Sequence, residues 1–263
     1  AVIEAQRALG RSAKLAAIDG DADGALAALR QGFCAARAYE RAPGLLHGLT
    51  WMLQVTMATD ALLTVASELP GVDLAEFEGD LAGLDAQAAL HRVMQEERAL
   101  GMGAFERGLH PSGVDWWTSP LTSLGLWLFE SNDQRVFLTT FAGALAASSE
   151  PGFSGRAAMG EATLALHDGA FALRSQFLFP AVHSAFDSAA AVHATATLAA
   201  AVLMGRREGT AAARSWIESQ LDPFSGVPYR TETLASGGVR AWSIGPGADL
   251  GTGDGIAAHL PGR

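Results

Sequence analysis

The sequence predicts a mainly α-helical fold, in which a multi-helix body, arranged as a bundle or a solenoid, precedes a small C-terminal β-hairpin and a Gly/Asp-rich loop. Three observations predict it. Apolar residues recur at helical spacing through most of residues 1–219. The helix-breaking pairs Asp19-Gly20, Pro43-Gly44 and Pro70-Gly71 divide that stretch into segments. After Leu221 the chain becomes rich in Gly, Pro, Asp and Ser and holds two short strand-like runs.

The first two helices are expected over residues 1–19 and 23–39. The interval Asp19-Gly20-Asp21-Ala22-Asp23-Gly24 matches the opening of an EF-hand calcium loop, but its twelfth position is Arg30, where that loop needs a glutamate. We therefore expect a helix end followed by an acidic N-cap of the second helix. Cys34, the only cysteine, lies in the apolar pattern of that helix and is expected to be buried. A single cysteine excludes an intramolecular disulfide and a zinc site built from cysteines.

A central helix over residues 45–69 is long enough to span a bilayer. Polar groups at Gln54, Thr56, Thr59 and Asp60 would then lie near the membrane centre, where such groups are costly. We therefore expect this helix to be buried within the protein. Further helices are predicted at residues 74–82, 85–107, 119–130, 133–147, 157–178 and 181–219, the last interrupted near Gly205–Gly209 and separated from its predecessor by Pro180.

Pro151 and two glycines mark residues 148–155 as a linker. In the tail, two strand-like runs flank a turn at Ser236-Gly237-Gly238, which predicts a hairpin of residues 228–233 and 239–244. The predicted organisation is therefore an N-terminal helical region, a C-terminal helical region and a β-hairpin/loop module, at residues 1–150, 151–221 and 222–263.

The formal net charge of −10 argues against a nucleic-acid binder, which needs a basic face for phosphates. It equally argues against electrostatic docking on anionic lipid. With 49% hydrophobic and only 17% charged residues, the chain suits a protein with large buried interfaces. Protein partners or self-association are therefore expected. Because the sequence begins at Ala1 without Met, membrane contact is expected only through an N-terminal anchor that has been removed.

No catalytic motif is present, since GxSxG, HExxH, a dinucleotide fingerprint and a P-loop are all missing from the sequence. Trp116, Trp117 and Trp127 are candidates for the lining of a ligand-binding groove, although large aromatic residues more often close a core or an interface. An enzyme would instead need distant residues to converge, namely His183, Asp187, His193 and Glu97.

In the tail, Asp249 and Asp254 flank a Gly-rich loop. Two carboxylates together with the carbonyl groups of such a loop suit a hard cation such as Ca²⁺. A solvated terminus without a ligand explains the same composition. The residues alone leave both interpretations open.

The segment Asp222-Pro223-Phe224-Ser225-Gly226-Val227-Pro228-Tyr229-Arg230, followed by Ala241-Trp242-Ser243-Ile244-Gly245-Pro246-Gly247, resembles the ending of a family of envelope proteins from planctomycetes and other bacteria. Residues 20–26 and 97–106 resemble two upstream segments of the same family. The biochemical role of its members is not established. The resemblance implies a helical extracytoplasmic body behind an N-terminal membrane anchor.

The tail is also similar to the C-terminal β-region of the type II secretion major pseudopilins, which carries a calcium-binding loop. That similarity implies Asp249 and Asp254 as Ca²⁺ ligands. The chain departs from the pseudopilin pattern in two respects, because Ala248 follows Gly247 and several helices stand in place of one long N-terminal helix.

These expectations combine into a non-enzymatic, extracytoplasmic bacterial protein, periplasmic or membrane-anchored with a periplasmic domain. It would mediate protein–protein contacts as an accessory subunit of an envelope assembly. Two alternatives stay open. One is a small-molecule-binding helical protein with an aromatic pocket, and the other is an enzyme whose His, Asp and Glu residues converge from separate helices.

Overall fold

The computed structural model describes residues 2–106, 120–159, 161, 173–235, 237–245 and 256–260. Of these residues 74% are helical, in nine helices, and a three-stranded antiparallel sheet lies near the C-terminus. The predicted fold class is therefore confirmed. The helices are α1 (Val2–Ile18), α2 (Ala22–Tyr39), α3 (Leu45–Glu68), α4 (Glu76–Ala82), α5 (Ala86–Glu106), α6 (Pro120–Ser149), the 3₁₀ turn η1 (Pro151–Phe153), α8 (Leu173–Glu208) and α9 (Thr210–Ser219).

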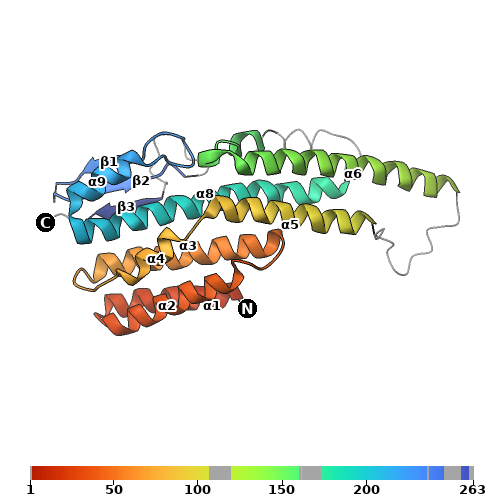
Figure 1. The fold of residues 1–263 in the computed structure, drawn as a ribbon. Coiled ribbons are helices and arrows are strands. Elements are labelled where there is room, and N and C mark those ends of the chain that lie inside the picture. Colours follow the sequence, from red (N-terminus) through yellow and green to blue (C-terminus); the bar gives the residue numbers. More distant parts are fainter. Residues whose placement is uncertain are drawn as a thin grey trace.

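The helices form an elongated bundle in which α3 lies between the α1–α2 pair and α8 (Figure 1). Helices α5, α6 and α8 extend past the ends of α1 and α3 on one side of the molecule. The small sheet and α9 cover the opposite end of α8. The chain termini of the described part therefore lie on different parts of the bundle, and the C-terminal module is attached to one end of its longest helix.

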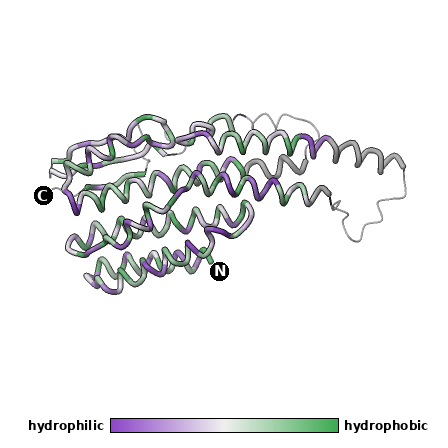
Figure 2. The backbone as a smooth tube through the Cα atoms, in the orientation of Figure 1, coloured by the Kyte–Doolittle hydropathy of each residue, from purple (hydrophilic) through white to green (hydrophobic). Residues whose placement is uncertain are grey.

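Helices α3 and α8 are central because each contributes to both hydrophobic cores. Figure 2 shows apolar residues along α3 and along the part of α8 that it colours. One core contains Leu62 of α3 and Leu198 of α8, and the other contains Met52 of α3 and Phe186 of α8. The segments Leu45–Glu68 and Ala181–Glu208 are long and apolar enough to cross a membrane, yet 56% and 67% of their apolar windows are buried inside the protein. Burial of α3 agrees with the predicted core helix.

The start of α2 is the acidic cap that the sequence predicts. Asp21 is the N-cap residue, and its carboxylate accepts a hydrogen bond from the Gly24 N–H at 2.9 Å. Gly20 has a φ of 77°, the left-handed conformation that commonly follows a helix C-terminus. Cys34 is exposed, so the expectation of a buried thiol is wrong. It follows the buried Phe33, and one residue further along an α-helix turns the side chain away from the core face.

Two helix boundaries differ from the prediction. Residues 120–149 form one helix instead of two, and α8 continues through Pro180 from Leu173 to Glu208. A proline inside a helix costs roughly 3 kcal/mol, and the contacts of α8 with α3, α5 and α6 offset that local penalty. The interruption predicted near Gly205–Gly209 is confirmed, because Gly209 has a φ of 96° and separates α8 from α9.

The predicted hairpin is present as β1 (Arg230–Thr233) and β2 (Val239–Trp242), which pair antiparallel. The third strand, β3 (Ala257–Leu260), pairs antiparallel with β2 and was not predicted. Its Ala-Ala-His-Leu sequence lacks the β-branched and aromatic residues by which strands are recognised. The inward residues Val239, Ala241, Ala258 and Leu260 are buried and join the core that contains the ends of α3 and α8.

Candidate functional site

The C-terminal module begins with a tight turn that is closed by its own backbone. The Asp222 N–H donates to the Val227 carbonyl at 2.8 Å, and the Gly226 N–H donates to the Asp222 carbonyl at 2.8 Å. Gly226 has a φ of 68°, a conformation that glycine adopts without steric cost. Leu221 and Pro228 form an isolated bridge across the base of the turn. The segment is therefore a defined turn of residues 222–227, with Asp222 at its base.

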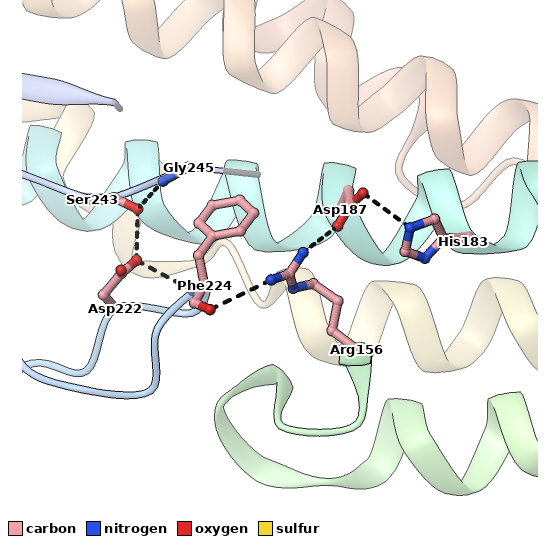
Figure 3. Close-up of polar contacts among 7 residues, drawn as sticks. All are labelled: Arg156, His183, Asp187, Asp222, Phe224, Ser243 and Gly245. Atoms are coloured by element: carbon pink, nitrogen blue, oxygen red, sulfur yellow. Dashed lines mark hydrogen bonds and ion pairs between the residues drawn. The ribbon is translucent and has the colours of Figure 1, made fainter. Parts of the chain in front are cut away.

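The Asp222 carboxylate joins this turn to the end of β2 (Figure 3). Asp222 is only 2% exposed, and its two oxygens accept hydrogen bonds from the hydroxyl of Ser243 at 2.6 Å and the hydroxyl of Ser225 at 2.7 Å. The backbone N–H of Phe224 donates to the same carboxylate at 3.3 Å. A buried carboxylate needs such donors, because an unpaired charge is costly away from water. Asp222 therefore acts as a structural acceptor inside the module.

Arg156 joins the same turn to the helical body. Its guanidinium donates to the Asp187 carboxylate on α8 at 2.8 Å and to the Phe224 carbonyl at 3.4 Å. The guanidinium carbon also lies 5.1 Å from the centroid of the Phe224 ring, in cation–π range. One turn earlier on α8, the His183 Nε2 lies 3.6 Å from the second oxygen of Asp187. Figure 3 shows Arg156 between Asp187 and Phe224, so this side chain links the turn to α8, in addition to the packing of the sheet on that helix.

The residues that could form an enzymatic site serve separate contacts. His183 and Asp187 lie close together. Glu97, on α5, instead directs its carboxylate to the start of α3, where it accepts a hydrogen bond from the Leu45 N–H at 2.9 Å. Glu96 accepts from the Gly44 N–H at 3.1 Å, so the two glutamates of α5 cap α3. Within the described residues, no group of three His, Cys, Asp or Glu side chains is placed to hold a metal ion.

His193 lies further along α8 and packs against Phe153, with ring centroids 5.7 Å apart. His193 is an exposed residue. The surrounding atoms nevertheless lower the pKa of His193 by desolvation, and the negative charges of Asp85 and Asp222 offset part of that effect. The charge of the Asp222 carboxylate therefore acts on the His193 imidazole through space, without a hydrogen bond between the two side chains.

Several predicted site residues lie outside the part of the chain that the structure describes. They include Asp249, Asp254, Trp116 and Trp117. The backbone of Trp127 belongs to α6, but its side chain is not among those that the structure describes. The calcium prediction and the aromatic-pocket prediction both stay predictions. The sequence also gave no sign of Arg156, because a cation that reaches across the fold leaves no local pattern.

A groove of about 660 Å³ lies elsewhere, between the end of α3, the α8–α9 junction and β3. At one side of the groove, Arg206 donates hydrogen bonds to four backbone carbonyls at the end of α3, those of Ala66 at 3.2 Å, Leu69 at 3.0 Å, Pro70 at 2.7 Å and Val72 at 2.6 Å. Burial lowers the pKa of Arg206, and the charge of Asp73 offsets part of that effect. The sequence did not predict this groove.

Comparison of the chain with protein-family models, with curated proteins and with solved structures found no match.

Proposed function

We propose that this chain is a non-enzymatic, extracytoplasmic helical protein that acts through protein–protein contacts as an accessory subunit of an envelope assembly. The observation that supports it most is the junction between the C-terminal module and α8. Arg156 bonds there to Asp187 of α8 and to the Phe224 carbonyl of the turn, and Asp222 fixes that turn to Ser243 inside the module. A module held in this way presents its outer surface in one orientation, as a docking element needs.

The outer surface of the junction turn is apolar. Leu221 is 55% exposed and Val227 is 50% exposed, and both lie at the base of the same turn. An apolar pair on a well-positioned turn suits the centre of a contact with another protein, where charged residues are depleted. The net charge of −10 suits a protein surface as partner better than a nucleic acid or anionic lipid.

The two apolar residues provide a test. In the turn variant, Leu221 and Val227 are both replaced by serine. The matched control replaces by serine the exposed pair Leu15 and Ile18 of α1, which are 61% and 64% exposed. Each affinity-tagged chain is expressed in the source organism, located by cell fractionation, cross-linked and purified. We expect recovery with the envelope and a partner of fixed stoichiometry, lost in the turn variant and kept in the control.

Two outcomes contradict the proposal. One is a monomer without partners that fractionates with the cytosol. The other is partner recovery that falls equally in the turn variant and in the α1 control, since the contact would then not involve the junction turn.

A calcium ion at Asp249 and Asp254 is a further part of the proposal, carried by the similarity of the tail to the pseudopilin β-region. Mass action requires the folded chain to melt at a higher temperature with calcium than with a chelator, by an amount that grows with the ion concentration. The Asp249→Asn, Asp254→Asn double variant should remove the difference. Equal melting temperatures with calcium and with chelator in the unmodified chain would remove calcium from the account.

A further inference from the structure

We propose that the groove beside β3 binds an extended, basic peptide segment, which adds to the sheet as a fourth strand. The inference goes beyond the contact proposed at the turn of Leu221 and Val227, because it assigns a second surface to a protein partner and names the chemistry of the segment bound there. It rests on the proposed function only in that it needs such a partner. Three features of the structure carry it: the unpaired side of β3, the shape of the groove, and the charges on its rim.

The hydrogen-bond phase of β3 leaves backbone groups directed away from the sheet. Among the described strands, β3 is the edge, because it pairs with β2 and with no other strand. The Ser243 N–H donates to the Ile256 carbonyl at 2.8 Å, and in an antiparallel ladder such pairs alternate. Residues 256, 258 and 260 therefore bond to β2, while Ala257 and His259 direct their N–H and C=O groups to the unpaired side.

The lining of the groove places it on that unpaired side, because it includes residues of β3 and none of β2. Ala257, Ala258 and His259 line it on the sheet side, and residues from the end of α3 and from the α8–α9 junction line the rest. In Figure 1, β3 and the end of α3 lie beside α8 at the same end of the molecule. At about 660 Å³ the groove has the size of a ligand site. Small residues keep it open, namely Ala66, Gly205, Gly209 and Ala258.

The charges favour a peptide over a small anion. Arg206 lines the groove, but its guanidinium already donates to four carbonyls at the end of α3, so it is not free to bind a phosphate or a carboxylate. Glu68 also lines the groove, is exposed, and takes part in none of the ion pairs within the described part of the chain. A strand with a lysine or arginine facing Glu68 would supply the missing cation.

The two edge strands of the sheet, β1 and β3, differ in their charged residues. On β1, Arg230 and Glu232 place exposed charges, and the side chains of Thr231 and Thr233 bond to Glu218 and Arg214 of α9. Charged residues on an edge strand hinder the addition of another strand. The sequence Ala-Ala-His-Leu of β3 carries no Lys, Arg, Asp or Glu. The unprotected edge is thus the one that faces the groove, which is the arrangement used for strand addition.

The test measures binding of a fluorescent peptide to the purified full chain. The probe alternates valine and threonine and carries one lysine. Matched probes replace that lysine with glutamate or carry N-methyl groups on alternate backbone nitrogens. We expect the lysine probe to bind, and N-methylation to weaken binding about tenfold or more, because it removes the backbone hydrogen bonds of strand addition.

Two variants of the chain assign the binding to the groove. Ala257→Pro removes an N–H that faces the groove and spares the ladder with β2, and Thr231→Pro makes the same change at the outward position of β1 as its control. Glu68→Lys should reverse the preference between the lysine and glutamate probes, without any change in the strand. We expect Ala257→Pro to weaken binding about tenfold and Thr231→Pro to leave it unchanged. Circular dichroism confirms that each variant is folded.

Several outcomes would overturn the inference. They are absence of probe binding, equal binding of the N-methylated probe, or an unchanged charge preference in Glu68→Lys. The proposed function is judged separately by partner recovery in cells. If the unmodified chain recovers a partner and Ala257→Pro recovers it equally well, the groove is not a contact surface for that partner, and only the inference about strand addition fails.

Discussion

Replacement of Asp222 tests whether one buried carboxylate organises the C-terminal module. In Asp222→Ala, the fully buried Ser243 hydroxyl loses the acceptor that now lies 2.6 Å away, and the Ser225 hydroxyl and the Phe224 N–H lose theirs. A buried donor left without a partner costs about 1–3 kcal/mol, and each further bond to the carboxylate contributes about 1 kcal/mol. We therefore expect the free energy of unfolding to fall by roughly 3–5 kcal/mol. Asp222→Asn keeps one carbonyl acceptor and should cost about half as much.

The assay is urea denaturation of the full chain followed by circular dichroism, with Ser225→Ala as the control that removes only one donor. The denaturation midpoint should be lowered least by Ser225→Ala, more by Asp222→Asn and most by Asp222→Ala. The slope of the unfolding free energy against urea concentration should stay the same in all three variants. Hydrogen exchange of the amides in residues 222–245 should accelerate in the same order. A loss below about 1 kcal/mol in Asp222→Ala, or equal losses in Asn and Ala, would refute this role of the carboxylate.

Three further predictions concern the helical body. Gly101→Ala would place a methyl group against the buried Phe137 ring and should lower the free energy of unfolding. Gly143→Ala has open space at its Cβ and should raise the free energy of unfolding by up to about 1 kcal/mol. Urea denaturation of both variants measures this difference. Gln54 is fully buried, and among the described residues neither side-chain polar atom has a hydrogen-bond partner. Gln54→Leu should therefore raise the thermal midpoint, and a lower midpoint would contradict this. Desolvation lowers the pKa of His193 from 6.5, so the unfolded chain binds the proton more readily and stability should fall as pH drops below about 6.5; His193→Gln should flatten that loss in denaturation curves between about pH 5 and 7.

The sequence predicted best those features that short stretches of chain decide. Asp21 caps α2 because its side chain reaches an amide three residues away, and the hairpin of β1 and β2 follows from strand-like runs around a turn. It failed where distant contacts decide. Pro180 signals a break, yet packing on three neighbouring helices keeps α8 continuous. The residues of β3 have no strand character of their own, and β2 and α8 make them a strand.

The same division applies to the candidate site. The end of the helical body after Leu221 was predicted from the sequence, because the aspartate, proline, serine and glycine that follow each favour turns for a local reason. The attachment of this segment to α8 was not visible, because Arg156 lies 68 residues before Phe224 in the chain. The groove beside β3 was equally hidden, since its lining comes from α3, α8 and β3, which are far apart in sequence.

The length of α8 has a consequence for how the molecule unfolds. At 36 residues this helix is about 54 Å long, and it contributes Phe186 to one core and Leu198 to the other without a break between them. Melting of either core would fray the helix that supports the second, so the two cores are thermodynamically coupled. We expect the chain to melt in a single cooperative transition, with equal calorimetric and van't Hoff enthalpies. A mechanical force that pulls on the C-terminal module would then have to unfold the whole helical body, and not the module alone.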